Sequence, residues 1–398
     1  MQYDFNRIID RRGSGALKYD ALEERFGRSD LLPMWVADMD FATPPFILDA
    51  IRRRLDHPVM GYTIDPADYI PAITDWLHAL HGVDVKPEWI SFIPGIVKGI
   101  GMVINCFLDK KEKVVVMPPV YHPFYLVPLA NGRKIEWNPL RELPEGGYAI
   151  DFDSLETLLA DPDTRLLLLS NPHNPAGIVW SREDLQRIAE AALRHDVIVV
   201  ADEIHSEMIL PHAVAEGKRH VPFYDVSPEA RKCSITFAAP SKTFNIAGIV
   251  SSYSIVPDDS LRRRFYTFLK ANELNEPTIF SPIATIAAYR EGAEWRREML
   301  EYVDANIDFT IDYCRRHIPG VVAQRPDASF LVWLDCRGLG LGQEQLVELF
   351  RDEAHLALND GTMFGLGGEG FMRLNVGCPR DTLADALERL ARAVANRR

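Results

Sequence analysis

Four side chains that could take part in catalysis or binding lie where apolar, β-branched runs of the sequence end. Tyr121 follows "KVVVM", Asn174 follows "RLLLLS", Asp202 closes "DVIVVAD", and Lys242 follows "CSITFAA". In an open α/β sheet, the ligand site lies at the carboxyl ends of the strands. If each run is a strand of one sheet, an aromatic ring, an amide, a carboxylate and a primary amine meet at one edge.

Lys242 is the most reactive of these groups. It lies in "FAAPSKTFNIAG", residues 237–248, which contain no acidic residue to pair with it. Apolar surroundings favour the neutral form of an amine whose reference pKa is about 10.4. A neutral amine is the nucleophile that a Schiff base requires. A solvated surface lysine is the commoner alternative, so the interpretation depends on the groups around it.

The other residues also have ordinary structural roles. Tyr121 suits a core or rim position, Asn174 lies in a Pro-rich run typical of turns, and Asp202 suits a helix cap. Upstream, "PGIVKGIG" places a glycine before a predicted helix, where free backbone N–H groups suit a phosphate. Glycines before helices are common. Together, however, an amine, a carboxylate, a stacking ring and a phosphate cradle are what pyridoxal phosphate requires.

The elements that must position these residues alternate between strand and helix. Between "RLLLLS" and "DVIVVAD", the segment "SREDLQRIAEAALRH" has its apolar residues on one helical face. Ser181 and Asp184 resemble a capping box at its start. This spacing predicts a βαβ unit with parallel strands and a right-handed crossover. "KVVVM", "CSITFAA" and "GIVSSYSIV" predict further strands, so the fold class is α/β with a wound sheet.

Two domains are predicted. Residues 49–280 form the α/β domain, and residues 1–48 together with 281–398 form a smaller α+β domain. The second contains a long amphipathic helix over 299–317, the strand-like "ASFLVWLDC" and "FMRLNVG", and the helical "QEQLVELFRDEAH" and "DTLADALERLARAVA". The first 45 or so residues are punctuated by Pro and Gly, and we expect them to lie across both domains.

Composition excludes several classes of function. The formal charge of −13 argues against nucleic-acid binding, which needs a basic face. The five cysteines are scattered and contain no CxxC pair, which argues against a disulfide framework or a metal site. The N-terminus has no apolar signal segment, and no apolar run has the length of a membrane span. We expect a cytoplasmic protein.

Four motifs carry a resemblance to a known family. "SNPHNPAG", "DEIHSEM", "PSKTFNIAG" and "FMRLNVGCPR" occur in the family's order and spacing. On these motifs the chain resembles, nearly end to end, the fold-type I, pyridoxal-phosphate-dependent aminotransferase-like family of class I/II. The segments "MWVADMDF", "GYT" and "ANELNEPTIFSPIATIAAY" are similar to those of its cystathionine β-lyase branch of carbon–sulfur lyases. The resemblance implies a large cofactor-binding domain with a mostly parallel sheet and a smaller α+β domain.

The resemblance also implies a role for each residue of the constellation. Lys242 would hold the cofactor covalently and, once released, move the Cα proton of the substrate. Asp202 would keep the pyridine nitrogen protonated, because an opposite charge favours the charged form. Asn174 would bond the phenolic oxygen of the ring, and Tyr121 would stack on it.

Further residues acquire roles on the same ground. The backbone N–H groups of Ile96 and Val97, together with Ser241, would hold the phosphate. Arg373 would clamp the substrate α-carboxylate, a bidentate task that suits arginine. Tyr62 would reach the site of a second copy, which implies a homodimer.

Two positions depart from the aminotransferase pattern. Three residues after the ring aspartate, His205 replaces the usual tyrosine, and eight residues after the lysine, Val250 replaces the usual arginine. The phosphate would then depend more on N–H and hydroxyl donors, and His205 either bonds the phenolic oxygen or orients Asp202. Both departures favour the lyase branch.

The implied activity is cleavage of L-cystathionine or a related L-cysteine conjugate by α,β-elimination to a thiol, pyruvate and ammonia. An aminotransferase is the alternative, because both reactions begin with the same carbanion. A binding protein without turnover is disfavoured because every catalytic position is filled, and a Rossmann dehydrogenase because no GxGxxG follows a first strand. No motif identifies the group that recognises the distal part of the substrate. Trp35, Asp38 and Tyr62 lie in candidate rim segments, where core or turn roles are equally compatible.

Overall fold

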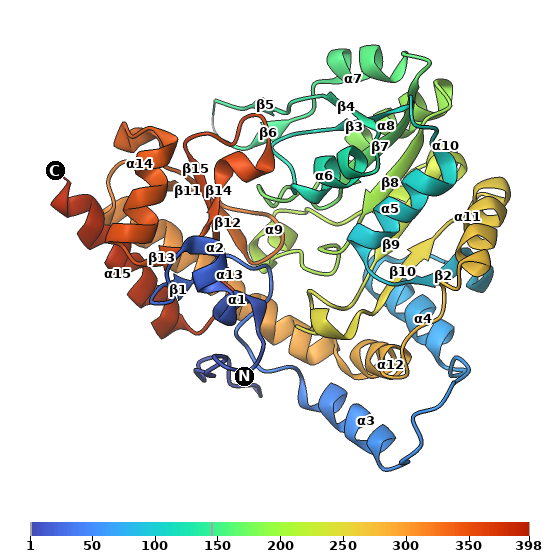
Figure 1. The fold of residues 1–398 in the computed structure, drawn as a ribbon, viewed down its shortest axis with the longest axis horizontal. Coiled ribbons are helices and arrows are strands. Elements are labelled where there is room, and N and C mark those ends of the chain that lie inside the picture. The colour runs from blue at the N-terminus through green and yellow to red at the C-terminus, as the bar shows by residue number, and fades with distance from the viewer. Residues whose placement is uncertain (1, 145, 398) are drawn as a thin grey trace.

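A seven-stranded sheet lies at the centre of the larger half of the computed structural model, which describes residues 2–144 and 146–397 (Figure 1). Its strand order is β2-β10-β9-β8-β7-β3-β4. The strands are β2 (Ile90–Ile93), β3 (Lys113–Val116), β4 (Lys134–Trp137), β7 (Thr164–Ser170), β8 (Ile198–Asp202), β9 (Ser234–Ala238) and β10 (Ser252–Ile255). The strands from β9 to β4 run parallel, whereas β10 is antiparallel to both neighbours. The predicted α/β fold with a mostly parallel sheet is confirmed.

Helices cover both faces of this sheet, and the central strands explain why. Val114 and Val116 of β3 pack into one apolar cluster, and Val115 between them packs into another on the opposite face. Because side chains alternate along a strand, a continuous apolar run is stable only where both faces are buried. The first face is covered by α5 (Ile96–Phe107), α6 (Pro123–Ala130) and α11 (Asp259–Ala271), and the second by α7 (Phe152–Leu159), α8 (Arg182–Arg194) and α10 (Pro228–Cys233).

The predicted βαβ unit is present. The hydroxyl of Ser181 accepts a hydrogen bond from the Asp184 N–H at 3.0 Å and so caps α8. β7 and β8 pair in parallel, with Ser170 opposite Asp202. The residues that follow these two strands therefore emerge at one edge of the sheet.

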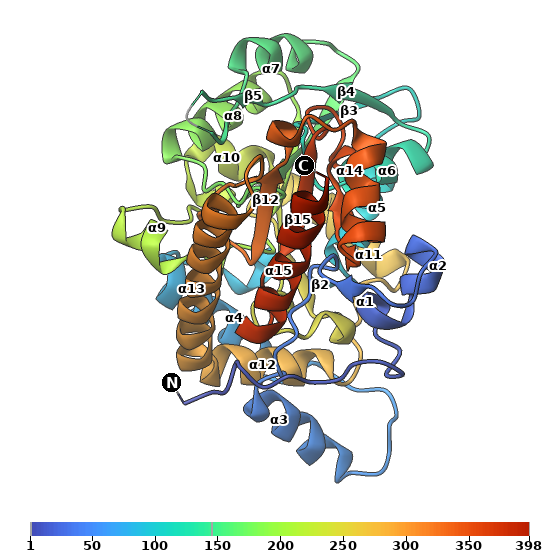
Figure 2. The ribbon, with the colours of Figure 1, turned by 90° about the vertical axis from the view of Figure 1, so that its left-hand side faces the viewer.

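The smaller half is built on a four-stranded antiparallel sheet in the order β11-β12-β15-β14. Figure 2 shows two long helices, α13 (Ala293–His317) and α15 (Arg380–Asn396), side by side in front of it. Its strands are β11 (Val322–Ala323), β12 (Leu331–Asp335), β14 (Asn359–Asp360) and β15 (Phe371–Asn375). The elements predicted for this part of the chain are present, although the helix α14 (Gln343–Glu348) continues as a π-helical turn over Leu349–Glu353.

The N-terminal segment links the two halves. Residues 34–41 are held by two asparagine side chains. Asn245, just after β9, donates to the carbonyls of Met39 and Phe41, and Asn375 of β15 donates to those of Val36 and Asp38. The segment thus contacts both halves, as expected, while the domain boundaries at 48/49 and 280/281 stay predictions.

The remaining helices and strands lie around these two sheets. They are α1 (Leu17–Asp20), α2 (Leu22–Phe26), β1 (Leu32–Pro33), α3 (Pro45–Leu55), α4 (Tyr69–His81), β5 (Arg141–Glu142), β6 (Tyr148–Ala149), α9 (Pro211–Ala215), α12 (Ser281–Glu291) and β13 (Leu356–Ala357). Among the residues described, no helix is both long enough and apolar enough to span a bilayer.

Candidate active site

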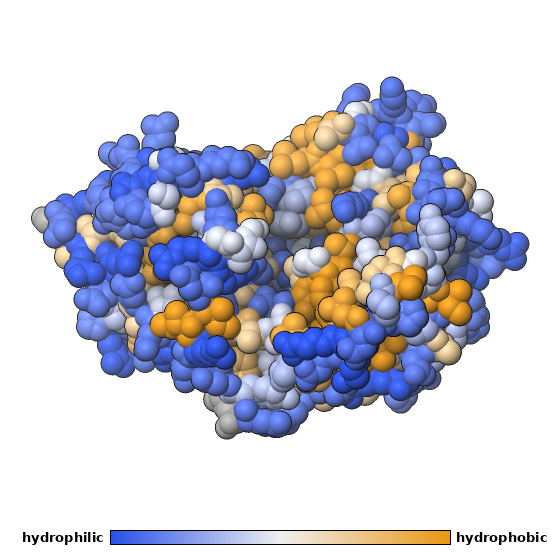
Figure 3. Space-filling model, turned by 60° about the horizontal axis from the view of Figure 1, so that its bottom comes forward, coloured by the Kyte–Doolittle hydropathy of each residue, from blue (hydrophilic) through white to orange (hydrophobic). Residues whose placement is uncertain are grey.

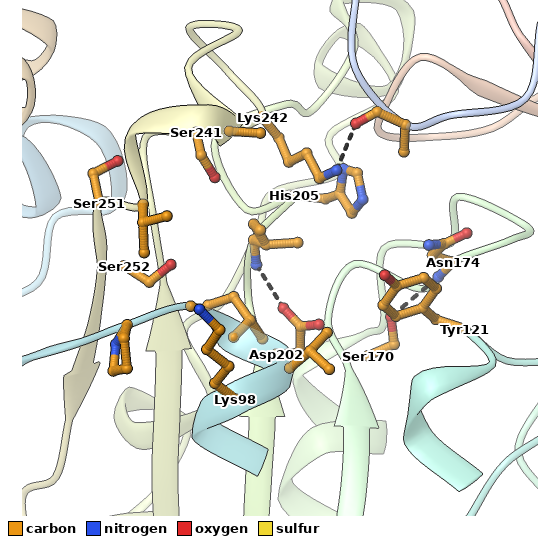
Figure 4. Close-up of a pocket in the computed structure, with 18 residues that line it drawn as sticks. Lys98, Tyr121, Ser170, Asn174, Asp202, His205, Ser241, Lys242, Ser251 and Ser252 are labelled. Atoms are coloured by element: carbon orange, nitrogen blue, oxygen red, sulfur yellow. Dashed lines mark hydrogen bonds between the residues drawn. The ribbon is translucent and has the colours of Figure 1, made fainter. Parts of the chain in front are cut away.

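Lys242 follows β9 and lines a cavity of about 290 Å³ at the carboxyl end of the sheet (Figure 4). Its Nζ donates a hydrogen bond to the carbonyl oxygen of Ala37 at 2.5 Å. Burial lowers the pKa of Lys242 to about 8, and the charge of Arg373 acts in the same direction. A larger share of this amine is therefore neutral at physiological pH than of a solvated lysine.

Asp202 ends β8 and is buried at the floor of the same cavity. One carboxylate oxygen accepts the backbone N–H of Ile204 at 3.1 Å, and within the described chain the side chain forms no ion pair. Burial raises the pKa of Asp202 to about 7. A cation placed against the free oxygen would lower that pKa again, so the site suits a positively charged ring nitrogen.

Asn174 and Tyr121 lie on the opposite side of the cavity from Ser241 and Ser252 (Figure 4). The Asn174 backbone is fixed at both ends, because its N–H donates to the Ser170 hydroxyl and its carbonyl accepts the Tyr121 N–H, each at 3.1 Å. The side-chain oxygen of Asn174 accepts a hydrogen bond from Arg373. Its side-chain NH₂ is thus oriented and left to donate to a ligand oxygen.

His205 is buried beside Lys242. Burial lowers the pKa of His205 to about 3, with further contributions from the charges of Lys242 and Arg373, so the ring is neutral. Its Nδ1 has no hydrogen-bond partner among the residues described, and no hydrogen bond joins it to Asp202. This geometry favours contact with a ligand over orientation of Asp202.

The other end of the cavity is suited to an anion. α5 begins after Gly95, which has φ 120° and no side chain to cap the helix. Among the described residues no side chain accepts a hydrogen bond from the N–H groups of Ile96 and Val97, and both residues line the cavity. Gly99 lets α5 pack closely, because a Cβ there would lie 2.8 Å from Cδ1 of Ile93. The hydroxyl of Ser241 lies at the same end (Figure 4).

Lys98 and Ser252 also belong to this end and are missing from the residues predicted. Lys98 is the third residue of α5, lines the cavity, and makes no ion pair within the described structure. Figure 4 shows its amine on the same side as the Ser252 hydroxyl. The signal available in the sequence was a lysine in the first turn of a glycine-started helix. Val250 lines the same cavity without charge, whereas Lys98, although exposed, offers a cation among the residues that line it.

Arg373 approaches from β15 and lines a second cavity of about 710 Å³, which shares Lys242 and Tyr121 with the first. Its guanidinium donates to Asn174 Oδ1 at 3.0 Å and to Asn359 Oδ1 at 2.7 Å. Among the described residues no carboxylate pairs with it, and its buried Nε has no partner. Burial lowers the pKa of Arg373 to about 10. A buried cation held only by neutral oxygens is suited to bind an anion.

Eight of the predicted residues therefore line one cavity, and Arg373 reaches it through its bond to Asn174. The eight are Ile96, Val97, Tyr121, Asn174, Asp202, His205, Ser241 and Lys242. Tyr62 is not among them. It is fully exposed on the loop between α3 and α4, beside a hollow that also includes Glu276. Its predicted contact with a second copy stays a prediction.

The sequence also matches a family model, over residues 29–390, for aminotransferase class I and II. The chain belongs to this family. Within the family, cystathionine β-lyase PatB of Bacillus subtilis (strain 168) is 43% identical and aligns over 98% of this chain and 100% of its own.

Two solved structures of the family are also close to this fold. Cystalysin from Treponema denticola, which contains a pyridoxal 5′-phosphate cofactor, has a TM-score of 0.95 and 32% identity, covering 100% of both chains. The pyridoxal-phosphate-bound C–S lyase from Staphylococcus hominis has a TM-score of 0.91 and 30% identity, covering 99% of this chain and 98% of its own. The family resemblance seen in the four motifs is thereby confirmed.

Proposed function

We propose that the protein is a pyridoxal-phosphate-dependent carbon–sulfur β-lyase. It cleaves L-cystathionine or a related L-cysteine conjugate by α,β-elimination to a thiol, pyruvate and ammonia. The observation that carries this proposal is the meeting, around one cavity, of a partly neutral lysine amine, an unpaired carboxylate and a buried guanidinium without an anion. The 43% identity to cystathionine β-lyase PatB over the whole chain supports it.

The residues present fit pyridoxal phosphate. Asp202 offers an unpaired buried carboxylate to the pyridine nitrogen, and Asn174 offers a side-chain NH₂ to the phenolic oxygen. Lys242 offers its amine to the aldehyde. The free N–H groups at the start of α5, with Ser241 and Lys98, offer donors to the phosphate. The pyridoxal phosphate bound in cystalysin supports this assignment.

When bound, the cofactor supplies a sink for the electron pair left on Cα. Arg373 holds the substrate carboxylate and thereby presents the Cα–H bond to Lys242. The neutral Lys242 amine accepts the Cα proton, and Ala37 orients that amine through its carbonyl oxygen. Asp202 would hold the pyridine end of the bound coenzyme, where its carboxylate would favour a positively charged nitrogen. In the overall reaction the Cβ–S bond breaks, the sulfur leaves as a thiolate that takes up a proton, and one water molecule is consumed to give pyruvate and ammonia.

An aminotransferase is the second candidate, because the family is named for that activity and the groups around the ring serve both reactions. Incubation with L-cystathionine tests the choice. The lyase proposal expects pyruvate and thiol in equal amounts without any 2-oxo acid acceptor. Amino transfer that depends on an acceptor, with no thiol released, would refute the lyase and support the aminotransferase.

Lys98→Ala should weaken coenzyme binding by about two- to fivefold, because an ionic contact to the phosphate is lost but Lys98 is exposed and water screens that contact. Equilibrium dialysis of the apoenzyme with pyridoxal phosphate measures this. Lys98→Arg should restore most of the affinity, and Lys232→Ala, which removes an exposed lysine of α10, serves as the matched control. Equal affinity in the wild type and Lys98→Ala would contradict a phosphate contact.

Coenzyme uptake should become faster as the pH rises toward 8. Only the neutral amine attacks an aldehyde, and because the pKa of Lys242 is about 8, its neutral fraction grows about tenfold per pH unit below that value and levels off above it. The pKa of Asp202, about 7, acts with the same sign, because its charged form binds the cationic ring nitrogen. Stopped-flow absorbance on the apoenzyme provides the measurement. A rate that falls between about pH 6 and 8 would contradict the assignment of Lys242.

We further propose a homodimer in which Tyr62 reaches the neighbouring site. Large apolar side chains are exposed on the loop between α3 and α4, including Val59, Tyr62 and Ile64. Figure 3 views the molecule from this side and shows apolar residues gathered around a hollow near its middle. Apolar surface of this kind marks interaction sites. A cytoplasmic location is also proposed, supported by the five cysteines, which are free thiols.

A further inference from the structure

The second cavity, which Arg373 and Lys242 both line, also reaches the N-terminal segment and the smaller half of the molecule, and we call it the distal pocket. Its volume of about 710 Å³ is more than twice that of the cavity beside the sheet. Because Arg373 takes the substrate carboxylate and Lys242 faces Cα, the group on sulfur is left to occupy this space. The distal pocket is therefore the candidate binding site for the S-substituent of the substrate.

Apolar side chains from distant parts of the chain form most of the distal pocket. They come from the N-terminal segment and from the smaller half of the molecule, and include Phe26, Trp35, Val347, Phe350, Leu358 and Met372. Trp35 contributes only its ring, because its Nε1–H already donates to the carbonyl of Lys18 at 2.9 Å. Its ring in turn contacts Phe26 edge to face, with centroids 5.2 Å apart.

Two charged groups that border the distal pocket, Asp360 and Arg351, already have partners. Asp360 accepts hydrogen bonds from Gln343 Nε2 at 2.6 Å and from the Thr362 N–H at 2.8 Å. Arg351 is bonded to Asp352 at 2.6 Å. A charged group entering the pocket would have to displace one of these pairs or lose its water without a replacement, which is costly.

Arg25 also lines the pocket, near its solvent-exposed edge. It lies 3.6 Å from Glu24, and its side chain is 56% exposed. An exposed pair of this kind contributes little, because water and salt screen it. Within the described residues, Arg373 and Lys242 are then the buried groups at the pocket that carry positive charge without a carboxylate partner. The substrate α-carboxylate uses Arg373, and the coenzyme uses Lys242.

We propose that the distal pocket binds an uncharged, apolar S-substituent, such as the alkyl or aryl group of an S-substituted L-cysteine, in preference to a charged one. L-cystathionine, whose distal end carries an ammonium and a carboxylate, is then a substrate but a poorer one. This inference rests on the proposed lyase function. Apolar surface gains from leaving water in such a pocket, whereas the two charges gain no new partner there.

The test compares two substrates of similar length that differ at the far end. They are S-pentyl-L-cysteine and S-(4-carboxybutyl)-L-cysteine, with pyruvate release measured for each and for L-cystathionine. The inference expects kcat/KM for the pentyl substrate to exceed both others by about tenfold or more. Equal values, or a preference for either charged substrate, would overturn it while leaving the lyase function in place. Absence of pyruvate from all three would instead refute the lyase itself.

A charge inserted at the pocket gives a second readout. Met363 lines the distal pocket and is exposed enough for a lysine to be accommodated. Met363→Lys should shift the ratio of kcat/KM values toward the carboxybutyl substrate by about tenfold. Val322→Lys adds the same charge on an exposed strand outside the pocket and should leave the ratio unchanged. The same ratio in both variants would show that the pocket does not bind the S-substituent.

Discussion

Replacing Lys242 with alanine should abolish β-elimination, with kcat/KM falling by at least about a thousandfold. The side chain has two tasks, because the same Nζ that holds the coenzyme also accepts the Cα proton. No other described lysine except Lys98 lines this cavity, and Lys98 lies at the opposite, phosphate end. Pyruvate release from L-cystathionine with saturating coenzyme measures the loss.

Two controls separate this loss from unfolding. Lys232→Ala removes an exposed lysine and should keep the wild-type rate. Lys242→Ala itself should still bind coenzyme without forming a covalent bond, because Asp202, Asn174 and the donors at the start of α5 are unchanged. A variant that retained a tenth of the wild-type rate would show that another group moves the proton.

Replacing Arg373 with glutamine should lower kcat/KM by about thirtyfold or more, because truncating one partner of a buried, hydrogen-bonded charge pair typically costs about 2–5 kcal/mol, and about 1.4 kcal/mol is a factor of ten. The substrate carboxylate would lose both the positive charge of Arg373 and the paired N–H donors of its guanidinium. Arg373→Lys keeps the charge but not the fork, so it should recover only part of the loss. Initial rates over a range of L-cystathionine concentrations provide the measurement.

Arg373→Gln should impair the binding of the substrate and not the binding of the coenzyme. Coenzyme uptake should change little, since Asn174 keeps its backbone bonds to Ser170 and Tyr121. Arg316→Gln, an exposed arginine of α13, is the matched control. A wild-type KM in Arg373→Gln would mean that the carboxylate binds elsewhere.

Much of the site was predictable because its residues follow strands. Tyr121, Asn174, Asp202 and Lys242 each stand just beyond an apolar run, and parallel strands bring such positions to one edge. Each of these strands is a continuous apolar run because helices bury both faces of the sheet. The start of α8 could also be predicted, because the contact between Ser181 and Asp184 that caps it spans only three residues of the sequence.

What escaped prediction depends on contacts between distant parts of the sequence. Ala37 orients Lys242 across 205 residues, and the segment that carries Ala37 is pinned by an ion network in which buried Lys18 lies 2.7 Å from Asp40. No local pattern marks a backbone carbonyl as a lysine partner. The role of Lys98 depends on where α5 is docked, and its type alone suggests an ordinary surface lysine.

The residues of β10 do not predict its direction either, because an apolar run can pair with its neighbours in a parallel or an antiparallel orientation. The connection decides it. Residues 239–251 contain a turn, Lys242 and the short 3-10 helix Ala247–Ile249, but no full helix to cross the sheet, so β10 returns antiparallel to β9. Because this connection is short, Lys242 and Ser252 line the same cavity.

The central claim is that the amine of Lys242 carries the coenzyme. Reduction of the holoenzyme with borohydride, followed by digestion and mass spectrometry of the peptides, tests it most directly. The account predicts that the peptide containing position 242 bears the reduced coenzyme in an amount equal to that of active sites. Modification of a different lysine, or an unmodified peptide from a preparation that contains bound coenzyme, would contradict it.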